Sequence, residues 1–234
     1  MKILLNLIKV SALFILIIGI CAGAFSKSHM NNFAYKNADI VNLQKVCPDV
    51  IVALEFARKD NVLGEQIYPD NVALVRGELA DKIRDICEYL KQYDLRLKIW
   101  AAYRPLSVQG KMYEKYSNPN WISHPSQGRR THTRGVAIDC TLVDAQGNEL
   151  QMPTGYLDFD NHVKMASSYP DLPAEIKNNR DFLITTMEKF GLQNYAGEWW
   201  HFELPNWSAY WIITKDMEIY DMNKDVIPRE DLYK

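Results

Sequence analysis

Two short polar motifs, far apart in the sequence, constrain the fold of this chain more than any other feature. The first is THTRGVAID at 131–139 and the second is GEWWH at 197–201. Two imidazoles and a carboxylate with a fourth position left open form the ligand set of a catalytic zinc, whereas structural zinc usually recruits four protein ligands, mostly thiolates. The chain must therefore fold so that both motifs meet, and it is predicted to be a zinc hydrolase. The expected ligands are His132, Asp139 and His201, with Glu198 left over as a further carboxylate.

The composition favours a small substrate over a polymeric one. Lysine and arginine number 27 against 29 aspartates and glutamates, and 47% of the 234 residues are hydrophobic. Such a balance creates no strong field that would select nucleic acid or an acidic lipid surface. We therefore expect no nucleic-acid partner, and the length suits one domain with a single core. The oligomeric state is not indicated by the sequence.

Residues 1–24 differ in character from the rest of the chain. Two lysines precede the apolar run 10–20, and Ala22-Gly23-Ala24 supplies the small residues of a cleavage site, which is the pattern of a cleaved secretory signal. The alternative is a retained single-span anchor. Lipidation at Cys21 is disfavoured because Ile20 is bulkier than the residue that lipoprotein processing requires. The mature protein is thus predicted to be exported to the periplasm or cell envelope, without stable membrane association.

Three cysteines remain after such a cleavage, and an odd number cannot pair completely within one chain. Cys47 and Cys87 could form one disulfide in an oxidising compartment, which would leave Cys140 as a buried thiol beside Asp139. Three unpaired cysteines in the core are an equal alternative. The redox state stays open at the level of sequence.

The remaining sequence is divided into a spacer at 25–40, a peptidase domain at 41–204 and an extension at 205–234 that packs on the domain or trails from it. Leucines and isoleucines recur every three or four residues between 79 and 90, which predicts one helix face. The α+β pattern predicts a central, mostly antiparallel sheet flanked by helices. Strands are expected at 50–54, 95–100, 136–142 and 200–204, and helices at 71–93, 105–116 and 173–190.

Local geometry suggests how the site residues are placed. Alternation along 136–142 predicts a strand with one face in the core and the other, bearing Asp139, toward a site. Gly135 would let the chain bend so that His132 folds back toward that carboxylate. Glu198 and His201 lie three residues apart, so a bend is needed to turn both toward one metal. Glu198 is then expected to act as the general base.

Arg104 lies at a predicted strand-to-helix junction, just before Pro105, where side chains reach clefts. An arginine there is a candidate for stabilising the oxyanion, because it is always charged and donates hydrogen bonds in a fork. The other histidines, His29, His124 and His162, have polar surroundings and no partner spacing. We expect no ligand among them, although His162 is the best placed of the three to line the site.

These motifs closely resemble those of the zinc D-Ala-D-Ala peptidase family, in particular dipeptidases of the VanX type, which share their fold with the Hedgehog signalling domain. The resemblance extends to about Leu204 and includes Tyr103-Arg104-Pro105, the pattern HxxGxAxD at 132–139 and EWWH at 198–201. It implies one zinc per chain, bound by the two histidines and the aspartate. It also implies Glu198 as the base and Arg104 as the residue that contacts the substrate carbonyl and the tetrahedral intermediate.

The resemblance further implies that Asp158 holds the free ammonium group of a small D-amino dipeptide substrate, and that Tyr68 lines the same pocket. Two positions depart from the family pattern. Ala101 stands where relatives have an aspartate, which removes a possible partner of Arg104, and Arg130 stands where they have a serine. Both departures bear on substrate preference more than on zinc chemistry.

The leading hypothesis is a dipeptidase that hydrolyses D-Ala-D-Ala, or a closely related dipeptide, for peptidoglycan turnover or dipeptide recovery. A D,D- or L,D-carboxypeptidase acting on peptidoglycan stem peptides would share the ligands but need an open cleft. Asp158 and the pair Trp199-Trp200 favour the dipeptidase. A third reading is a non-catalytic, zinc-stabilised wall-binding module, which the presence of Glu198 and Arg104 disfavours.

Overall fold

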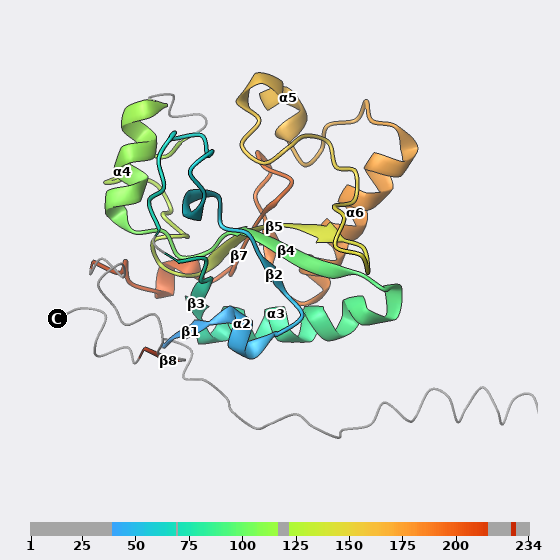
Figure 1. Ribbon diagram of the computed structural model, residues 1–234, viewed down its shortest axis with the longest axis horizontal. Helices are drawn as coiled ribbons and strands as arrows, with labels where there is room; N and C mark the ends of the chain where they lie inside the picture. Colours follow the sequence, from blue (N-terminus) through green and yellow to red (C-terminus); the bar gives the residue numbers. More distant parts are fainter. Residues whose placement is uncertain (1–38, 69, 117–121, 215–225, 228–234) are drawn as a thin grey trace, which may run out of the picture. The chain divides into compact units, whose positions relative to one another are not determined.

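The fold is described from a computed structural model, which covers residues 39–68, 70–116, 122–214 and 226–227 (Figure 1). The described residues belong to one compact unit. The predicted signal peptide, and all of the predicted spacer except its last two residues, lie outside the described residues. Within the described residues, no helix combines the length and apolar character needed to cross a membrane.

The main sheet has five strands in the order β2-β4-β5-β7-β6. β2 pairs with β4 in parallel, and the other neighbours are antiparallel, which confirms the predicted α+β class with a mostly antiparallel sheet. The strands are β2 (Ile51–Val52), β4 (Arg96–Ala101), β5 (Ala137–Val143), β6 (Gln193–Asn194) and β7 (His201–Glu203).

A second, three-stranded sheet has the order β3-β1-β8 and is antiparallel. It consists of β1 (Ile40–Asn42), β3 (Leu74–Arg76) and β8 (Val226–Ile227). Ile40 is fully buried, so the packed unit begins inside the segment that was predicted to be a spacer. Past Leu204 it continues through the buried residues Tyr210 and Ile213.

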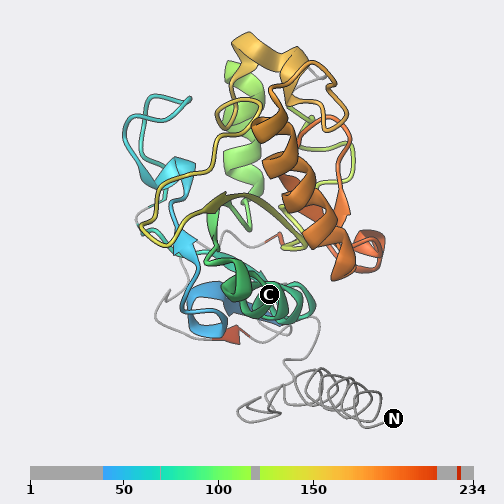
Figure 2. The same cartoon turned by 90° about the vertical axis from the view of Figure 1, so that its right-hand side faces the viewer.

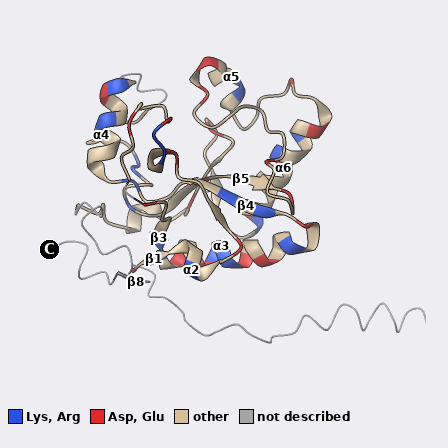
Figure 3. Ribbon diagram, in the orientation of Figure 1, with Lys and Arg blue, Asp and Glu red and all other residues tan. Residues whose placement is uncertain are grey.

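Two long helices flank the main sheet (Figures 1 and 2). Helix α3 (Gly77–Leu90) packs against β4, and α6 (Ala174–Lys189) packs against β5 and β6. The rings of Tyr89 on α3 and Phe190, just after α6, lie 5.5 Å apart, and those of Tyr93, just after α3, and Phe182 on α6 lie 5.0 Å apart. Each helix therefore contacts a residue just beyond the end of the other. α3 and α6 carry acidic and basic residues together, as Figure 3 shows, in keeping with the balanced composition.

The shorter helices and single turns connect these layers. Helix α4 (Leu106–Lys115) begins one residue later than predicted, immediately after Pro105. The others are α2 (Leu43–Val46), α5 (His162–Met165), and the 3-10 turns η1 (Glu55–Ala57), η2 (Lys91–Tyr93), η3 (Phe159–Asn161) and η4 (Trp207–Ala209).

The structure corrects one predicted element and confirms another. The helix predicted to start at 71 starts at Gly77, because Leu74–Arg76 pair with β1 instead, and this long-range pairing overrides the local helical pattern. Strand β5 carries Asp139 toward the cavity as predicted, and all seven residues of the strand are buried. It lies in the middle of the sheet between β4 and β7, so both of its edges are paired.

Candidate metal centre

Strand pairing brings the two motifs together. In the antiparallel register of β5 and β7, Asp139 stands directly opposite His201. His132 comes from the turn that precedes β5, where Gly135 has a φ of 72° and its N–H donates to the His132 carbonyl. This left-handed turn, which glycine adopts without strain, directs the imidazole back toward the strand.

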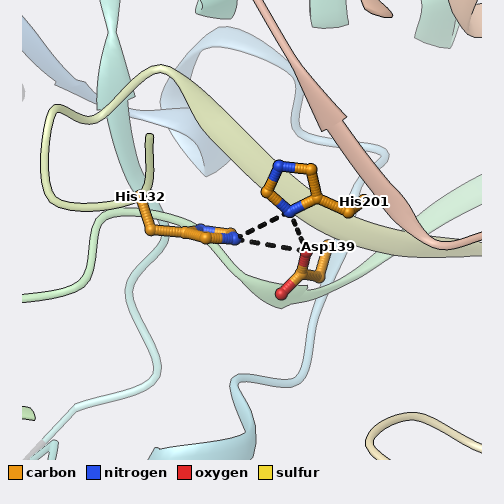
Figure 4. Close-up of side chains that lie close together, drawn as sticks. All are labelled: His132, Asp139 and His201. Atoms are coloured by element: carbon orange, nitrogen blue, oxygen red, sulfur yellow. Dashed lines mark hydrogen bonds and ion pairs between the residues drawn. The ribbon is translucent and has the colours of Figure 1, made fainter. Parts of the chain in front are cut away.

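Three side-chain atoms from these residues converge (Figure 4). His132 Nε2 and His201 Nδ1 lie 3.2 Å apart, and each approaches Asp139 Oδ1, at 3.2 Å and 3.0 Å. All three residues are buried, and their ligand atoms lie within 4.8 Å of one another. The bend expected between Glu198 and His201 is present, since the His201 N–H donates to the Glu198 carbonyl and Glu198 Oε2 lies 3.9 Å from His201 Nδ1.

The outer ring nitrogens show that this donor set suits a cation. His132 Nδ1 lies 2.8 Å from the carbonyl of Ala102, and His201 Nε2 lies 3.2 Å from Glu203 Oε2. A neutral imidazole that donates through its outer nitrogen presents a lone pair at the inner one. Two imidazole lone pairs would thus face a carboxylate oxygen, and three acceptors repel one another unless a positive charge lies between them. The residues fit a metal ion with nitrogen and oxygen ligands.

The titration behaviour of the ligands is consistent with this arrangement. Burial lowers the pKa of His132, which favours the neutral imidazole that a metal requires. Burial alone would raise the pKa of Asp139, but the adjacent His132 and His201 outweigh it and lower that pKa well below its usual range. The carboxylate is therefore ionised at neutral pH. Its second oxygen, Oδ2, accepts a hydrogen bond of 2.7 Å from the hydroxyl of Tyr156.

Glu198 lies beside the ligands with its side chain 19% exposed. Burial raises the pKa of Glu198 to about 7, and the neighbouring Asp139 adds to this effect, while His201 and Arg104 oppose it. A carboxylate with a pKa near the working pH is suited to accept and return a proton. A nearby dication would lower that pKa again, since it favours the charged form.

Arg104 lines the same cavity, three residues after the end of β4, and is buried. Its Nη2 lies 3.6 Å from Asp139 Oδ2, and its Nη1 donates a 3.0 Å hydrogen bond to Gln109 on α4. Burial alone would lower the pKa of Arg104, but Tyr156 and Asp139 outweigh it and raise it. Ala101 pairs with Asp139 in the sheet and has no polar side chain to offer Arg104, whose guanidinium is hydrogen-bonded to Gln109.

Asp158 and Tyr68 are less closely associated with this cluster. The Asp158 carboxylate caps η3, accepting from the backbone N–H of Asn161 at 3.3 Å and from its side-chain amide at 2.9 Å. The preceding Leu157 lines the cavity and has a φ of 54°. Tyr68 is half-buried against Phe56, with ring centroids 6.0 Å apart, and contributes to the raised pKa of Arg104.

The other three histidines and Arg130 differ in whether they line the cavity. His162 is exposed on α5 and does not line the cavity, contrary to its ranking above the other two histidines, while His124 contacts the ring of Tyr113. His29 lies outside the described residues. Arg130 does line the cavity, with a φ of 49°.

The cavity measures about 130 Å³, well below the roughly 300–1,000 Å³ that is typical of sites for drug-sized ligands.

Sequence reasoning missed three residues: Glu203 and Tyr156, which contact the cluster, and Gln109, which contacts Arg104. Glu203 could have been found, because residues two apart on a strand share a face and His201 was placed on a strand. Gln109 lies one turn into a helix whose start was predicted, so its direction was accessible only once the helix was oriented. Tyr156 reaches Asp139 from a loop, and no spacing rule signals such a contact.

The sequence is similar to those of known dipeptidases. The sequence model of the D-ala-D-ala dipeptidase family, Peptidase_M15, matches residues 36–218. The chain belongs to this family. The D-alanyl-D-alanine dipeptidase of Escherichia coli (strain K12) is 31% identical over 172 residues, which cover 74% of this chain and 88% of that protein. The D-alanyl-D-alanine dipeptidase of Enterococcus faecium is 26% identical over 170 residues, covering 64% and 83%.

Among solved structures, the LD-carboxypeptidase LdcB superposes with a TM-score of 0.39 and 14% identity, covering 75% of this chain and 73% of that chain.

Proposed function

We propose that the protein is a zinc-dependent dipeptidase that hydrolyses D-Ala-D-Ala, or a closely related D-amino dipeptide, in the cell envelope. Membership of the D-ala-D-ala dipeptidase family supports the reaction class. The single observation that carries the proposal is the convergence of His132 Nε2, Asp139 Oδ1 and His201 Nδ1 beside the partly exposed carboxylate of Glu198.

The proposed roles follow from the contacts. His132, Asp139 and His201 would hold one zinc ion, which supplies Lewis acidity that lowers the pKa of a water molecule and polarises a carbonyl. Glu198 accepts the proton of the attacking water and then donates it to the departing amine. Arg104, held by Gln109, donates hydrogen bonds to the oxygen on which negative charge develops. Tyr156 fixes the second oxygen of Asp139.

The proposal also covers substrate selection. Asp158 is proposed to bind the substrate ammonium, and Tyr68 to line the same pocket, on the strength of the family resemblance. Each oxygen of the Asp158 carboxylate accepts one hydrogen bond from Asn161 and keeps a lone pair that could accept from a substrate ammonium. A D,D- or L,D-carboxypeptidase is the second candidate, since a stem peptide has no free ammonium at that position.

A substrate panel separates the candidates. Purified protein loaded with zinc is incubated with D-Ala-D-Ala, with D,L-, L,D- and L,L-dipeptides, and with a stem pentapeptide, and the release of free alanine is measured. We expect D-Ala-D-Ala to give the highest kcat/KM. Faster cleavage of the pentapeptide would refute the dipeptidase, and absence of cleavage of every substrate would support a non-catalytic module.

The location is also proposed. The signal-like residues 1–24 and the disulfide between Cys47 and Cys87 both support export to an oxidising compartment, the periplasm or cell envelope. Released dipeptide would there arise from peptidoglycan turnover. N-terminal sequencing of the protein recovered from the envelope fraction tests this, and an intact Met1 in a cytoplasmic fraction would refute it.

A further inference from the structure

Glu203 lies behind the candidate ligand His201, on the side away from Asp139. The two residues are separated by one position on β7 and so share a face of the strand. Glu203 is 1% exposed, and its Oε2 lies 3.2 Å from His201 Nε2. A carboxylate that accepts a hydrogen bond from the outer nitrogen of an imidazole fixes the ring and its tautomer, and leaves the inner nitrogen free for a metal.

Arg129 completes this arrangement. It forms an ion pair with Glu203 Oε1, the oxygen that does not face His201. The guanidinium lies over two aromatic rings, 5.7 Å from the centroid of Tyr195 and 5.6 Å from that of Trp207. Cation–π contacts of this kind hold a charged group where it is partly desolvated.

Trp207 connects the arrangement to the segment beyond residue 204, for which the sequence suggested no role. It forms the first residue of η4, and the guanidinium of Arg134 also lies over its ring, at 5.4 Å. A continuous series of contacts thus runs from Trp207 through Arg129 and Glu203 to His201.

We propose that Glu203 and Arg129 are positioning residues for the metal ligand His201, and that Trp207 of the C-terminal segment holds them in place. The proposal rests on the proposed function only in requiring that a metal ion binds the cluster. Arginine only donates hydrogen bonds and an ionised carboxylate only accepts them. The direction of each hydrogen bond from Arg129 through Glu203 to His201 is therefore fixed. The hydrogen of His201 is thereby kept on Nε2, and the lone pair of Nδ1 faces Asp139 and His132.

This direction of the hydrogen bonds leads to a specific prediction for the substitution Glu203→Gln. Arg129 will attract the amide oxygen, so the amide NH₂ will face His201 Nε2. The imidazole then accepts at Nε2 and carries its hydrogen on Nδ1, where it blocks the metal. We expect zinc affinity to fall by about 10–100-fold, the range typical for loss of an outer partner of a metal ligand. In the double variant Glu203→Gln/Arg129→Met the amide is free to turn its oxygen to His201, so part of the affinity returns.

The test is competition for zinc against a chromophoric chelator, which measures affinity independently of catalysis. Wild type, Glu203→Gln, Arg129→Met and the double variant are compared. Ile86→Val, in the core of α3, serves as the control that destabilises the fold without touching the cluster. Thermal unfolding and far-UV circular dichroism, both recorded without zinc, establish that each variant is folded.

The expected order of zinc affinity is wild type and Ile86→Val highest, the double variant intermediate and Glu203→Gln lowest. Equal affinity of Glu203→Gln and wild type would overturn the proposal. So would a double variant weaker than both single variants, because the two residues would then act only through general packing. Failure of the wild type itself to bind zinc would instead refute the proposed function.

Discussion

At the scale of single residues, hydrolysis is expected to depend most directly on Glu198. The isosteric substitution Glu198→Gln removes the carboxylate that can accept a proton but keeps its shape beside His201. Loss of a general base lowers rates by roughly 10²–10⁴-fold. We therefore expect kcat for D-Ala-D-Ala to fall by about that factor while KM changes little, as measured by alanine release at substrate saturation.

The control for this prediction is the zinc content of the variant. Glu198 is not part of the three-atom cluster, so Glu198→Gln should bind zinc as tightly as wild type. A variant that retains full activity would show that another group accepts the proton. A variant that loses zinc would show that Glu198 belongs to the ligand set.

The residues that meet at the cluster could be identified from sequence because metal ligation restricts residue type and spacing together. His132, Asp139 and His201 come from two motifs, and the structure brings them together through the pairing of β5 with β7 and the turn that precedes β5. The residues behind them could not be identified equally well. Tyr156 contacts Asp139 from an irregular loop, and many residue types can serve as an outer hydrogen-bond partner, so composition gives no signal.

At the scale of elements, the local sequence pattern correctly predicted the helices and strands whose tertiary contacts favour the same conformation. The strand at 96–101 and the helices at 106–115 and 174–189 lie within one or two residues of their predicted bounds. The strand β3 was missed because its pairing with β1 links distant segments, and β6 is only two residues long. Pairings of this kind depend on the whole chain, so a local window cannot show them.

Two glycines should respond oppositely to the same substitution. Gly135 has a φ of 72°, and a Cβ there would lie 2.9 Å from Ile40 Cδ1. Gly135→Ala should therefore destabilise the protein by about 1–3 kcal/mol. Gly110 lies inside α4 with open space around it, so Gly110→Ala should stabilise by about 0.5–1 kcal/mol. Urea denaturation of both variants measures the two changes in the free energy of unfolding and shows whether they have opposite signs.

Equal effects of the two substitutions would contradict this account, since it attributes the difference to backbone conformation and space alone. A destabilising Gly110→Ala would indicate a close contact near α4. Gly135→Ala is also expected to displace the turn that carries His132, so its zinc affinity should fall, whereas that of Gly110→Ala should not.

At the scale of the whole molecule, the disulfide is expected to contribute substantially to stability. Cys47, at the end of α2, is joined to Cys87 on α3 across a sequence separation of 40 residues, and Cys140 is a buried free thiol. A bond closing such a loop typically stabilises by about 2–4 kcal/mol. Dithiothreitol should lower the urea midpoint of wild type but not that of Cys47→Ala/Cys87→Ala. An unchanged wild-type midpoint would contradict the prediction.

The C-terminal segment should make stability depend on pH in the alkaline range. The hydroxyl of Tyr210 donates a hydrogen bond to Glu78 on α3, and Tyr210 is buried. Burial, and secondly this hydrogen bond to a carboxylate, raise the pKa of Tyr210 above its ordinary value. Tyrosine in the unfolded chain loses its proton near pH 10. The native state then binds more protons than the unfolded state, so stability must fall as pH rises further.

The contribution of Tyr210 can be isolated by comparing wild type with Tyr210→Phe. Below about pH 10 both states keep the proton and the contribution is fully present; above it, the contribution falls by up to about 1.4 kcal/mol per pH unit. Tyr210→Phe removes the titrating hydroxyl, so its urea midpoint should decline less steeply between about pH 9 and pH 11. Other tyrosines titrate equally in both proteins and cancel. Parallel pH profiles would show that the segment beyond residue 204 is not anchored to α3 through this bond, and Trp207 would then be held by its arginine contacts alone.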